Sequence, residues 1–256
     1  MKPTALITGA SGGIGYELAK LFAKSGYALI VVARSEDKLQ QLKEELKGHS
    51  VTIIVQDLSK PGAAEALYNK VREQGRTVEV LVNNAGFGLN GLFDEILLRD
   101  QQAMMQVNIQ TLTELTHYFL PDMKNTRMNG VPRGVLNVSS VAAFQPGPRM
   151  AVYYASKAYV LSFSEALVEE LKGTGVTVTT LCPGATETKF FETANAQDTK
   201  LTDRMMSPKQ VANEGFVGFI KGKRVVIPGK MNRSMAIATK FMSRSAAAKV
   251  AHYMDK

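Results

Sequence analysis

The sequence predicts an α/β fold in which a parallel sheet is covered by helices on both faces. Short β-branched or apolar runs alternate with longer stretches of helical periodicity, which is typical of βαβ units. The apolar runs are continuous, as expected for strands that are buried on both faces. A length of 256 residues suits one large domain, which would bury about 75% of the surface of its unfolded chain.

The elements can be placed in order along the chain. Seven strands are predicted at 5–8, 28–33, 51–55, 78–82, 134–138, 176–181 and 224–227. Six helices are predicted at 14–25, 36–47, 63–74, 101–119, 150–172 and 208–221. Right-handed crossovers between these parallel strands make the sheet doubly wound. The polar segment 192–203 has no clear periodicity, so we expect a flexible flap there.

Composition excludes several classes of protein. With 45% hydrophobic and 21% charged residues, the chain is neither disordered nor of low complexity. The single cysteine, Cys182, excludes a disulfide framework and suits a reducing compartment such as the cytoplasm. No apolar run reaches 18 residues, and the first three residues lead directly into a strand, so we expect neither a membrane span nor a signal peptide. The three histidines stand far apart, and no metal site is expected.

A glycine-rich turn joins the first strand to the first helix. It contains Gly9, Ser11, Gly13, Ile14 and Gly15, and with the preceding threonine its spacing is T-G-x-x-x-G-x-G. Glycines there permit positive φ and let backbone N–H groups approach a pyrophosphate, while the helix N-terminus adds a favourable dipole. An ordinary glycine turn is the alternative. The position on the first strand of an α/β pattern favours a Rossmann-type dinucleotide-binding domain.

The end of the second strand indicates which dinucleotide is bound. An acidic residue at this place would hydrogen-bond a ribose 2′-OH and repel a 2′-phosphate. Ala33 occupies the place, and Arg34 follows it. A guanidinium can bind a phosphate through two parallel hydrogen bonds. The sequence therefore predicts NADP(H) over NAD(H), with Ser35 as a further contact; a solvated surface arginine is the alternative.

A tyrosine and a lysine near the start of a predicted helix form the strongest catalytic signal. Tyr153 and Lys157 are four residues apart and share one helix face. An ammonium group nearby should lower the phenol pKa from its usual value near 10. The pair could then act as general acid in carbonyl reduction or as base in alcohol oxidation. Tyr154 competes with Tyr153, but its partner at i+4 is Ala158.

Taken together, these motifs resemble the classical short-chain dehydrogenase/reductase family over nearly all of residues 3–228. The resemblance implies that Ser140, 13 residues before Tyr153, hydrogen-bonds the substrate carbonyl oxygen. Ser139 should point the other way along an extended backbone. The resemblance also implies that Asn108 anchors a water linked to Lys157; a surface amide is the alternative. The four catalytic positions, Asn108, Ser140, Tyr153 and Lys157, are all present.

The resemblance further implies a set of cofactor contacts. Asp57 and Leu58 would touch the adenine, although a turn-capping aspartate is an equally good interpretation. The segment 83–86 would line the cofactor, and the segment 183–188 would fix the nicotinamide carboxamide. The full predicted set is Gly9, Ser11, Gly13, Ile14, Gly15, Arg34, Ser35, Asp57, Leu58, Asn84, Ala85, Gly86, Tyr153, Lys157, Pro183, Gly184, Thr186 and Thr188.

The substrate is expected to be a hydrophobic ketone or secondary alcohol. Mostly apolar side chains follow the strand ends where such pockets form. The candidate walls are Phe87, Ala142, Phe144, Gln145, Met150, Phe190 and Phe191. The sequence thus predicts an NADP(H)-dependent oxidoreductase. An NADP(H)-binding regulatory or sensor protein with vestigial catalysis is the alternative, and the glycine spacing disfavours an extended-family epimerase.

The formal net charge of +8 belongs to the C-terminal end. Residues 1–220 hold 22 basic and 22 acidic residues, whereas residues 221–256 hold nine basic residues against Asp255. We therefore divide the chain into a catalytic domain, 1–228, and a basic tail, 229–256, with one helix starting at Ser234. Docking on its own domain or on a second subunit of a homodimer or homotetramer, contact with an anionic membrane, and contact with an acidic acyl carrier stay open. Nucleic acid is not expected.

Overall fold

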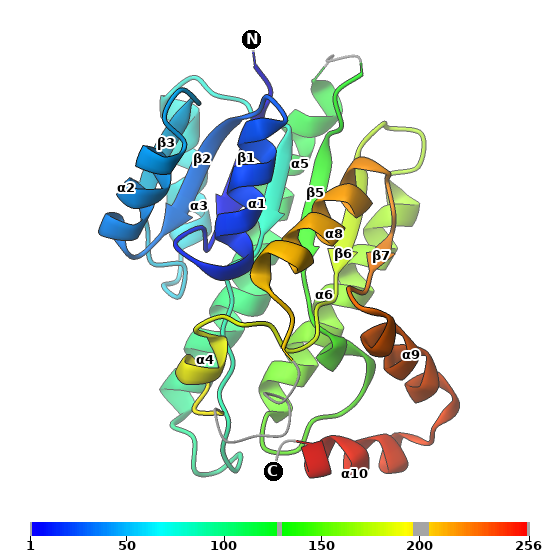
Figure 1. Cartoon of the computed structure of the whole chain (residues 1–256). Coiled ribbons are helices and arrows are strands. Elements are labelled where there is room, and N and C mark those ends of the chain that lie inside the picture. The colour runs from blue at the N-terminus through cyan, green and yellow to red at the C-terminus, as the bar shows by residue number, and fades with distance from the viewer. Residues whose placement is uncertain (1, 127–129, 197–204, 255–256) are drawn as a thin grey trace.

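Seven parallel strands form the centre of the molecule in the order 3-2-1-4-5-6-7 (Figure 1). The computed structural model describes residues 2–126, 130–196 and 205–254. Its strands are β1 Thr4–Thr8, β2 Ala28–Ala33, β3 Val51–Val55, β4 Val80–Asn83, β5 Gly134–Val138, β6 Thr177–Leu181 and β7 Val225–Val226. The predicted α/β class and the parallel sheet are confirmed.

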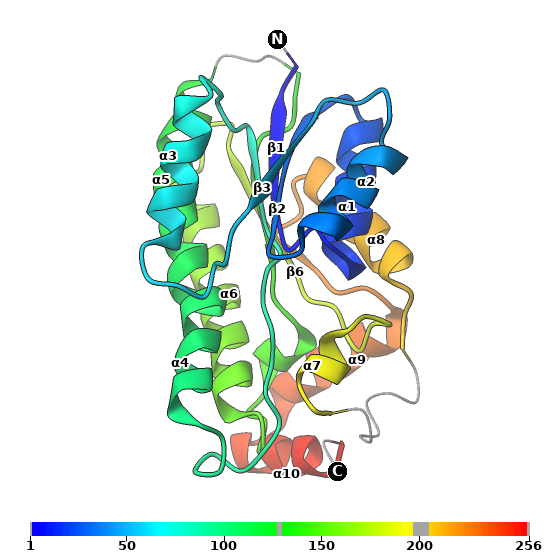
Figure 2. The same cartoon turned by 90° about the vertical axis from the view of Figure 1, so that its left-hand side faces the viewer.

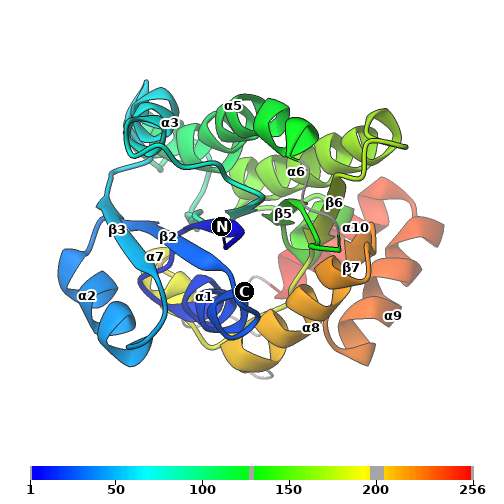
Figure 3. The same ribbon diagram turned by 90° about the horizontal axis from the view of Figure 1, so that it is seen from above.

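Helices cover both faces of the sheet (Figures 2 and 3). One face carries α1 Gly13–Lys24, α2 Glu36–Glu45 and α8 Pro208–Ile220, and the other carries α3 Ala63–Glu73, α5 Leu112–Asn125 and α6 Ala151–Glu170. Every residue of β1, β2 and β5 is buried, which explains why these strands read as continuous apolar runs. Each face has its own apolar core: Phe22 and Phe219 lie in one, Leu67 and Phe119 in the other.

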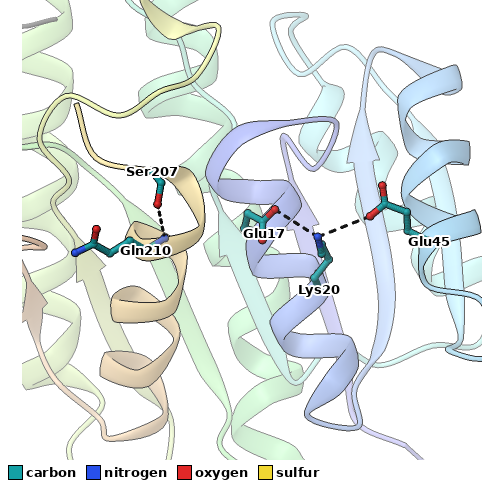
Figure 4. A network of polar contacts seen from close by, with 5 residues as sticks. All are labelled: Glu17, Lys20, Glu45, Ser207 and Gln210. Carbon is teal, nitrogen blue, oxygen red and sulfur yellow. Dashed lines mark hydrogen bonds and ion pairs between the residues drawn. The ribbon is translucent and has the colours of Figure 1, made fainter. Parts of the chain in front are cut away.

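Polar contacts mark the outer surface around α1, which lies between α2 and α8 (Figure 4). The Lys20 Nζ atom is 3.5 Å from Glu17 Oε1 in the same helix and 3.7 Å from Glu45 Oε2 at the end of α2. The Ser207 hydroxyl accepts a hydrogen bond of 3.2 Å from the Gln210 amide and so caps α8. Because such partly exposed ion pairs stabilise a fold by about 1 kcal/mol or less, the buried face of α1 contributes more.

The helix predicted at 101–119 is instead three consecutive segments. They are α4 Leu98–Met105, a π-helix Gln106–Thr111 and α5. A π-turn adds a residue to the turn and re-aims the side chains around it, and such turns are frequent at functional sites. Apolar periodicity does not reveal this turn, because the apolar positions on both sides of it stay buried.

The tail is not the single helix that the sequence predicts from Ser234. It folds as α9 Lys230–Ala238, a 3₁₀ turn Thr239–Phe241 and α10 Arg244–Met254. The break has a local cause: the Ser243 hydroxyl accepts a hydrogen bond from the Ala246 amide at 3.2 Å and starts a new helix. Within the described part of the chain, no helix is both long and apolar enough to cross a lipid bilayer.

The predicted flap at 192–203 is described only in its first part. A short helix, α7 Phe190–Thr193, overlaps its start, and residues 197–203 lie outside the described residues. A 3₁₀ turn, Val141–Phe144, follows β5. Both segments lie at the carboxyl end of the sheet, beyond the last residues of β5 and β6.

Candidate active site

The predicted site residues gather at the carboxyl ends of β1, β4, β5 and β6. The order in which strands are added to the sheet reverses between β1 and β4. These two strands pair directly, although β2 and β3 separate them in the sequence. The loops after two such strands diverge and leave a crevice, which is where ligands bind in open α/β sheets. Here the glycine turn follows β1, and Asn84 to Gly86 follow β4.

The glycine turn is held by the loop after β4. Gly9 has a φ of 66°, and a Cβ atom added there would lie 2.7 Å from the Asn84 amide nitrogen. A Cβ atom on Gly15 would lie 2.5 Å from the Gly9 carbonyl oxygen. The Asn84 side chain donates to the carbonyls of Thr8 at 2.9 Å and Gly9 at 3.1 Å. Asn84 therefore fixes the shape of the turn. A cavity of about 330 Å³ opens beside it, lined by Ser11, Gly12, Gly13, Tyr16, Glu17, Lys38, Gln41, Glu187 and Pro208.

The ends of β2 and β3 bring two exposed cations, Arg34 and Lys60, near the carboxylate of Asp57. Arg34 is exposed and forms no ion pair with a carboxylate of the described residues. The Asp57 carboxylate accepts hydrogen bonds from the Ser59 amide at 3.0 Å and the Ser59 hydroxyl at 2.7 Å. Burial raises the pKa of Asp57, but these bonds and the nearby Arg34 charge outweigh it and lower that pKa. The geometry of Asp57 is thus that of a turn-capping aspartate, while Leu58 is buried.

Tyr153 and Lys157 lie on the buried face of α6. Tyr153 is only 8% exposed and Lys157 only 6% exposed. The Lys157 Nζ atom lies 5.7 Å from the centre of the Tyr153 ring and donates a 3.0 Å hydrogen bond to the Val138 carbonyl. The Tyr153 ring packs 5.1 Å from the Phe190 ring. The structure therefore brings together the two residues that the helical spacing pairs.

The predicted lowering of the Tyr153 pKa is not what the structure gives. Burial raises the pKa of Tyr153 to about 12, and a hydrogen bond with Ser140 only partly opposes it. Burial also lowers the pKa of Lys157 to about 8. The physical reason is that both groups leave water together, so the charged form of each is disfavoured. In addition, Lys157 donates its hydrogen bond to a backbone carbonyl.

Two adjacent serines after β5 point in opposite directions. The Ser139 hydroxyl donates to the Lys157 carbonyl at 2.8 Å and thereby ties α6 to the sheet. The Ser140 hydroxyl accepts from the Ala142 amide at 3.1 Å, lies 3.4 Å from the Pro183 carbonyl and bonds the Tyr153 side chain. The structure thus places Ser140 beside the tyrosine and Ser139 behind it.

Asn108 lies in the π-helix and is only 1% exposed, so it is not a surface amide. Its side chain accepts from the Phe87 amide at 3.2 Å and donates to the Phe87 carbonyl at 3.0 Å. It also donates to the Ser156 hydroxyl at 3.1 Å. A Cβ atom on Gly86 would lie 2.9 Å from Asn108 Oδ1 and 3.4 Å from Lys157 Nζ. Asn108 and Lys157 therefore meet around Gly86.

The loop after β6 borders both the glycine turn and the tyrosine. The Thr186 hydroxyl donates to the Gly184 carbonyl at 2.9 Å, and the Thr188 hydroxyl accepts from the Phe190 amide at 3.2 Å. A Cβ atom on Gly13 would lie 2.8 Å from the Thr188 methyl group. This loop therefore connects the glycine turn, through Thr188, to Phe190.

An apolar cluster surrounds Tyr153. Its buried members are Met104, Ala142, Met150, Tyr153, Tyr154, Phe191, Ala194, Ala196 and Ala251, with Phe87 and Phe190 packed against them. Phe144 and Gln145, which the sequence also suggests as walls, are not in this cluster. Ala251 comes from α10, and the local sequence contains no signal that could have identified it. Among residues 2–126, 130–196 and 205–254, no group of His, Cys, Asp or Glu side chains could hold a metal ion.

Comparison with known proteins gives one matching family model and three informative relatives. The family model described as short chain dehydrogenase matches residues 3–199. Sulfoacetaldehyde reductase 2 of Chromohalobacter salexigens is 37% identical, over 80% of this chain and 81% of its own. A short-chain dehydrogenase of Sphingobium yanoikuyae, solved with NADPH, is 31% identical over 93% of each chain, with a TM-score of 0.82. The bulky-bulky ketone specific alcohol dehydrogenase of Comamonas testosteroni is 26% identical, over 97% of this chain and 98% of that one, with a TM-score of 0.76.

Proposed function

The chain belongs to the short-chain dehydrogenase family, an oxidoreductase family acting on alcohol and carbonyl groups, and we propose that it uses NADP(H) to interconvert a hydrophobic ketone and a secondary alcohol. The observation that carries this proposal is the meeting of Tyr153, Ser140, Lys157 and Asn108 at one edge of the sheet, next to the glycine turn.

The residues at the crevice fit a nicotinamide dinucleotide. Side chains at Gly9 and Gly15 would collide with the Asn84 side chain, so the tight turn requires glycine at both positions. Such a turn lets backbone N–H groups approach a pyrophosphate. Arg34 is a cation without an ion pair among the described residues, at the place where a 2′-phosphate would lie. Thr188 and the rest of the loop after β6 would orient the nicotinamide. When bound, the cofactor supplies or accepts the hydride.

The chain's own residues handle the proton. In reduction, the Tyr153 hydroxyl gives its proton to the substrate oxygen as general acid. The Ser140 hydroxyl hydrogen-bonds the same oxygen and stabilises the charge that develops on it. Below about pH 8 the Lys157 ammonium is charged and lies 5.7 Å from the centre of the Tyr153 ring, so a cation stands near the negative charge that forms when Tyr153 gives up its proton. Asn108 would hold a water that links Lys157 to solvent, so that a proton from solvent can replace the one that Tyr153 has given up.

Further observations support the preference for NADP(H) and the hydrophobic nature of the substrate. The relative from Sphingobium yanoikuyae was solved with NADPH, which agrees with an arginine in place of an acid after β2. The apolar cluster around Tyr153 favours a hydrophobic substrate, as does the likeness to an alcohol dehydrogenase specific for bulky ketones. Sulfoacetaldehyde is small and anionic, so the substrate panel must include such aldehydes. A homodimer or homotetramer and a cytoplasmic location stay predictions.

The proposal is tested by assaying a panel of ketones, aldehydes and alcohols with NADPH, NADH and their oxidised forms. Tyr153→Phe removes the proton donor but keeps the ring, so we expect kcat to fall at least ~100-fold with little change in NADPH binding. Tyr159→Phe is the matched control, because Tyr159 is in the same helix, is 37% exposed and bonds Thr113 instead. Tight NADPH binding without turnover of any substrate would instead support a sensor protein.

A further inference from the structure

The outer side of the C-terminal helices exposes an unusual number of large apolar side chains. Phe241, in the turn between α9 and α10, is 86% exposed, and four further apolar residues of the tail are 44–50% exposed. We call this set the tail surface: Met231, Met235, Ile237, Phe241 and Val250, together with the cations described next. Burying a large apolar side chain is worth about 1.5–3 kcal/mol. A single exposed apolar residue is ordinary, but several on adjoining helices are typical of an interaction surface.

The same surface carries only positive charge. Residues 229–254 contain no aspartate or glutamate, whereas the rest of the chain up to residue 220 is neutral. The exposed cations of the tail surface are Lys230, Arg233, Lys240, Arg244 and Lys249. None of them forms an ion pair with a carboxylate in the described part of the chain. Two of these cations, Lys240 and Arg244, flank the exposed Phe241 ring in sequence.

The tail surface has a fixed position on the molecule. The two helices bury three of their own residues, Ala236 in α9 and Ala247 and Ala251 in α10. At the start of α9, the Asn232 side chain donates a hydrogen bond to the Pro228 carbonyl at 2.9 Å. The two helices meet at one corner of the molecule (Figure 1). The inner face of the tail is thus packed, and the apolar and cationic side chains are left on the outer face.

We propose that the tail surface binds peripherally to an anionic lipid membrane. A membrane interface offers hydrocarbon to Phe241 and phosphate or carboxylate groups to the cations around it, so it matches both features at once. A second copy of the chain docking tail to tail would present the same positive charge and be repelled, and its neutral body offers no excess of carboxylates to the cations. A nucleic acid would match the charge alone. Ala251 packs in the cluster around Tyr153, so binding would hold the substrate pocket near the membrane; only this consequence depends on the proposed function.

Insertion can be measured directly because the chain contains no tryptophan. Phe241→Trp places a single tryptophan in the full-length protein. Its fluorescence is recorded with phosphatidylcholine vesicles that contain 30% phosphatidylserine. We expect a blue-shifted emission and quenching by brominated lipid. Phe93→Trp is the matched control, since Phe93 is 66% exposed but lies outside the tail. An unquenched fluorophore in the Phe241→Trp variant, or equal quenching of both variants, would overturn the proposal.

The charge requirement is tested by vesicle co-sedimentation of the full-length protein. Lys240→Glu with Arg244→Glu should weaken binding at least ~25-fold, because each cation near an anionic surface contributes roughly a five-fold effect. Lys43→Glu with Lys47→Glu changes the net charge equally on exposed α2 and the segment after it, and should have a much smaller effect. Binding should also fall at 0.5 M salt. Thermal melting checks that each variant folds.

Three results would overturn the membrane assignment. Equal binding to pure phosphatidylcholine would show that the anionic headgroups are not recognised. A Phe241→Ser variant that changes the oligomeric size, with no binding of the native chain to either vesicle, would make this face a contact between copies. Preference for an acidic acyl carrier protein over vesicles would identify a protein partner. None of these results depends on turnover, so failure of the enzymatic proposal would be seen separately.

Discussion

Adjacent residues of the same or similar type have different tasks in this molecule. Ser139 bonds the backbone of α6 while Ser140 bonds the side chain of Tyr153. Asn83 donates to Thr116 of α5 and to Asn137 of β5 in the core, whereas Asn84 bonds the glycine turn. In each pair, the backbone at a strand end turns successive side chains to opposite sides. A single residue of register therefore separates a side chain that ties sheet and helix together from one that faces the candidate site.

The first prediction at this scale concerns Arg34. Arg34→Ala should weaken NADPH binding about 10- to 150-fold and leave NADH binding unchanged, because a charge-assisted hydrogen bond contributes roughly 1.5–3 kcal/mol. The measurement is the dissociation constant of each cofactor by titration calorimetry. Arg99→Ala is a suitable control, since Arg99 is also exposed but pairs with Asp100. Equal use of both cofactors by the native protein would contradict the NADP(H) preference.

The second prediction concerns the stability cost of Lys157. Burial lowers its pKa to about 8 from the usual 10.5, so the folded state binds fewer protons than the unfolded state between these pH values. The free energy of unfolding should therefore rise with pH from about 8 to 10.5 through this group. Lys157→Met should abolish turnover yet stabilise the protein at pH 7 by about 1–3 kcal/mol, measured by urea unfolding. A destabilised variant at pH 7 with native pH dependence would contradict this.

At the scale of elements, residues of the candidate site lie where one kind of regular structure gives way to another. The glycine turn precedes α1, and the π-helix between α4 and α5 carries Asn108. Helices continue on both sides of the π-helix, and their buried positions pack on the sheet before and after it. The π-helix determines what faces the crevice, since Asn108 bonds Phe87 and Ser156 from this turn.

The glycine turn gives the third prediction. Gly15→Ala places a methyl group 2.5 Å from the Gly9 carbonyl oxygen and against the Asn84 side chain, so it should destabilise the cofactor-free protein by about 1–3 kcal/mol. Gly12→Ala is the control in the same turn: its backbone is extended, with φ 176°, and nothing lies within 4 Å of the new methyl group. Urea unfolding of both variants provides the comparison. Equal stability of the two would show that the turn is not tightly packed.

At the scale of the whole molecule, the basic tail and the neutral body meet at the site. The tail contributes Ala251 to the cluster around Tyr153, although about a hundred residues separate them in sequence. The outer side of the same helices forms the tail surface. The tail thus has two faces, one that packs in the apolar cluster around Tyr153 and one that carries the net charge of the protein.

The fourth prediction follows from the inner face of the tail. Ala251→Leu should overpack the cluster, lower the free energy of unfolding by about 1–3 kcal/mol and reduce kcat/KM for bulky ketones. NADPH affinity should stay unchanged, because the glycine turn lies on other elements. Ala248→Leu, at a half-buried position of the same helix, should have a smaller effect on both quantities. Enhanced turnover of bulky ketones by the Ala251 variant would contradict a closed pocket there.

Local sequence is enough to predict the strands, the glycine turn, the pairing of Tyr153 with Lys157 and the location of the net positive charge. These features depend on short spacings and local composition, which the chain carries wherever it folds. Four further features are visible only in the folded chain: the π-turn at Asn108, the break in the tail, the packing of Ala251 in the apolar cluster around Tyr153 and the raised pKa of Tyr153. Each of these depends on how deeply a group is buried or on which distant segment packs against it, and neither is written in local periodicity.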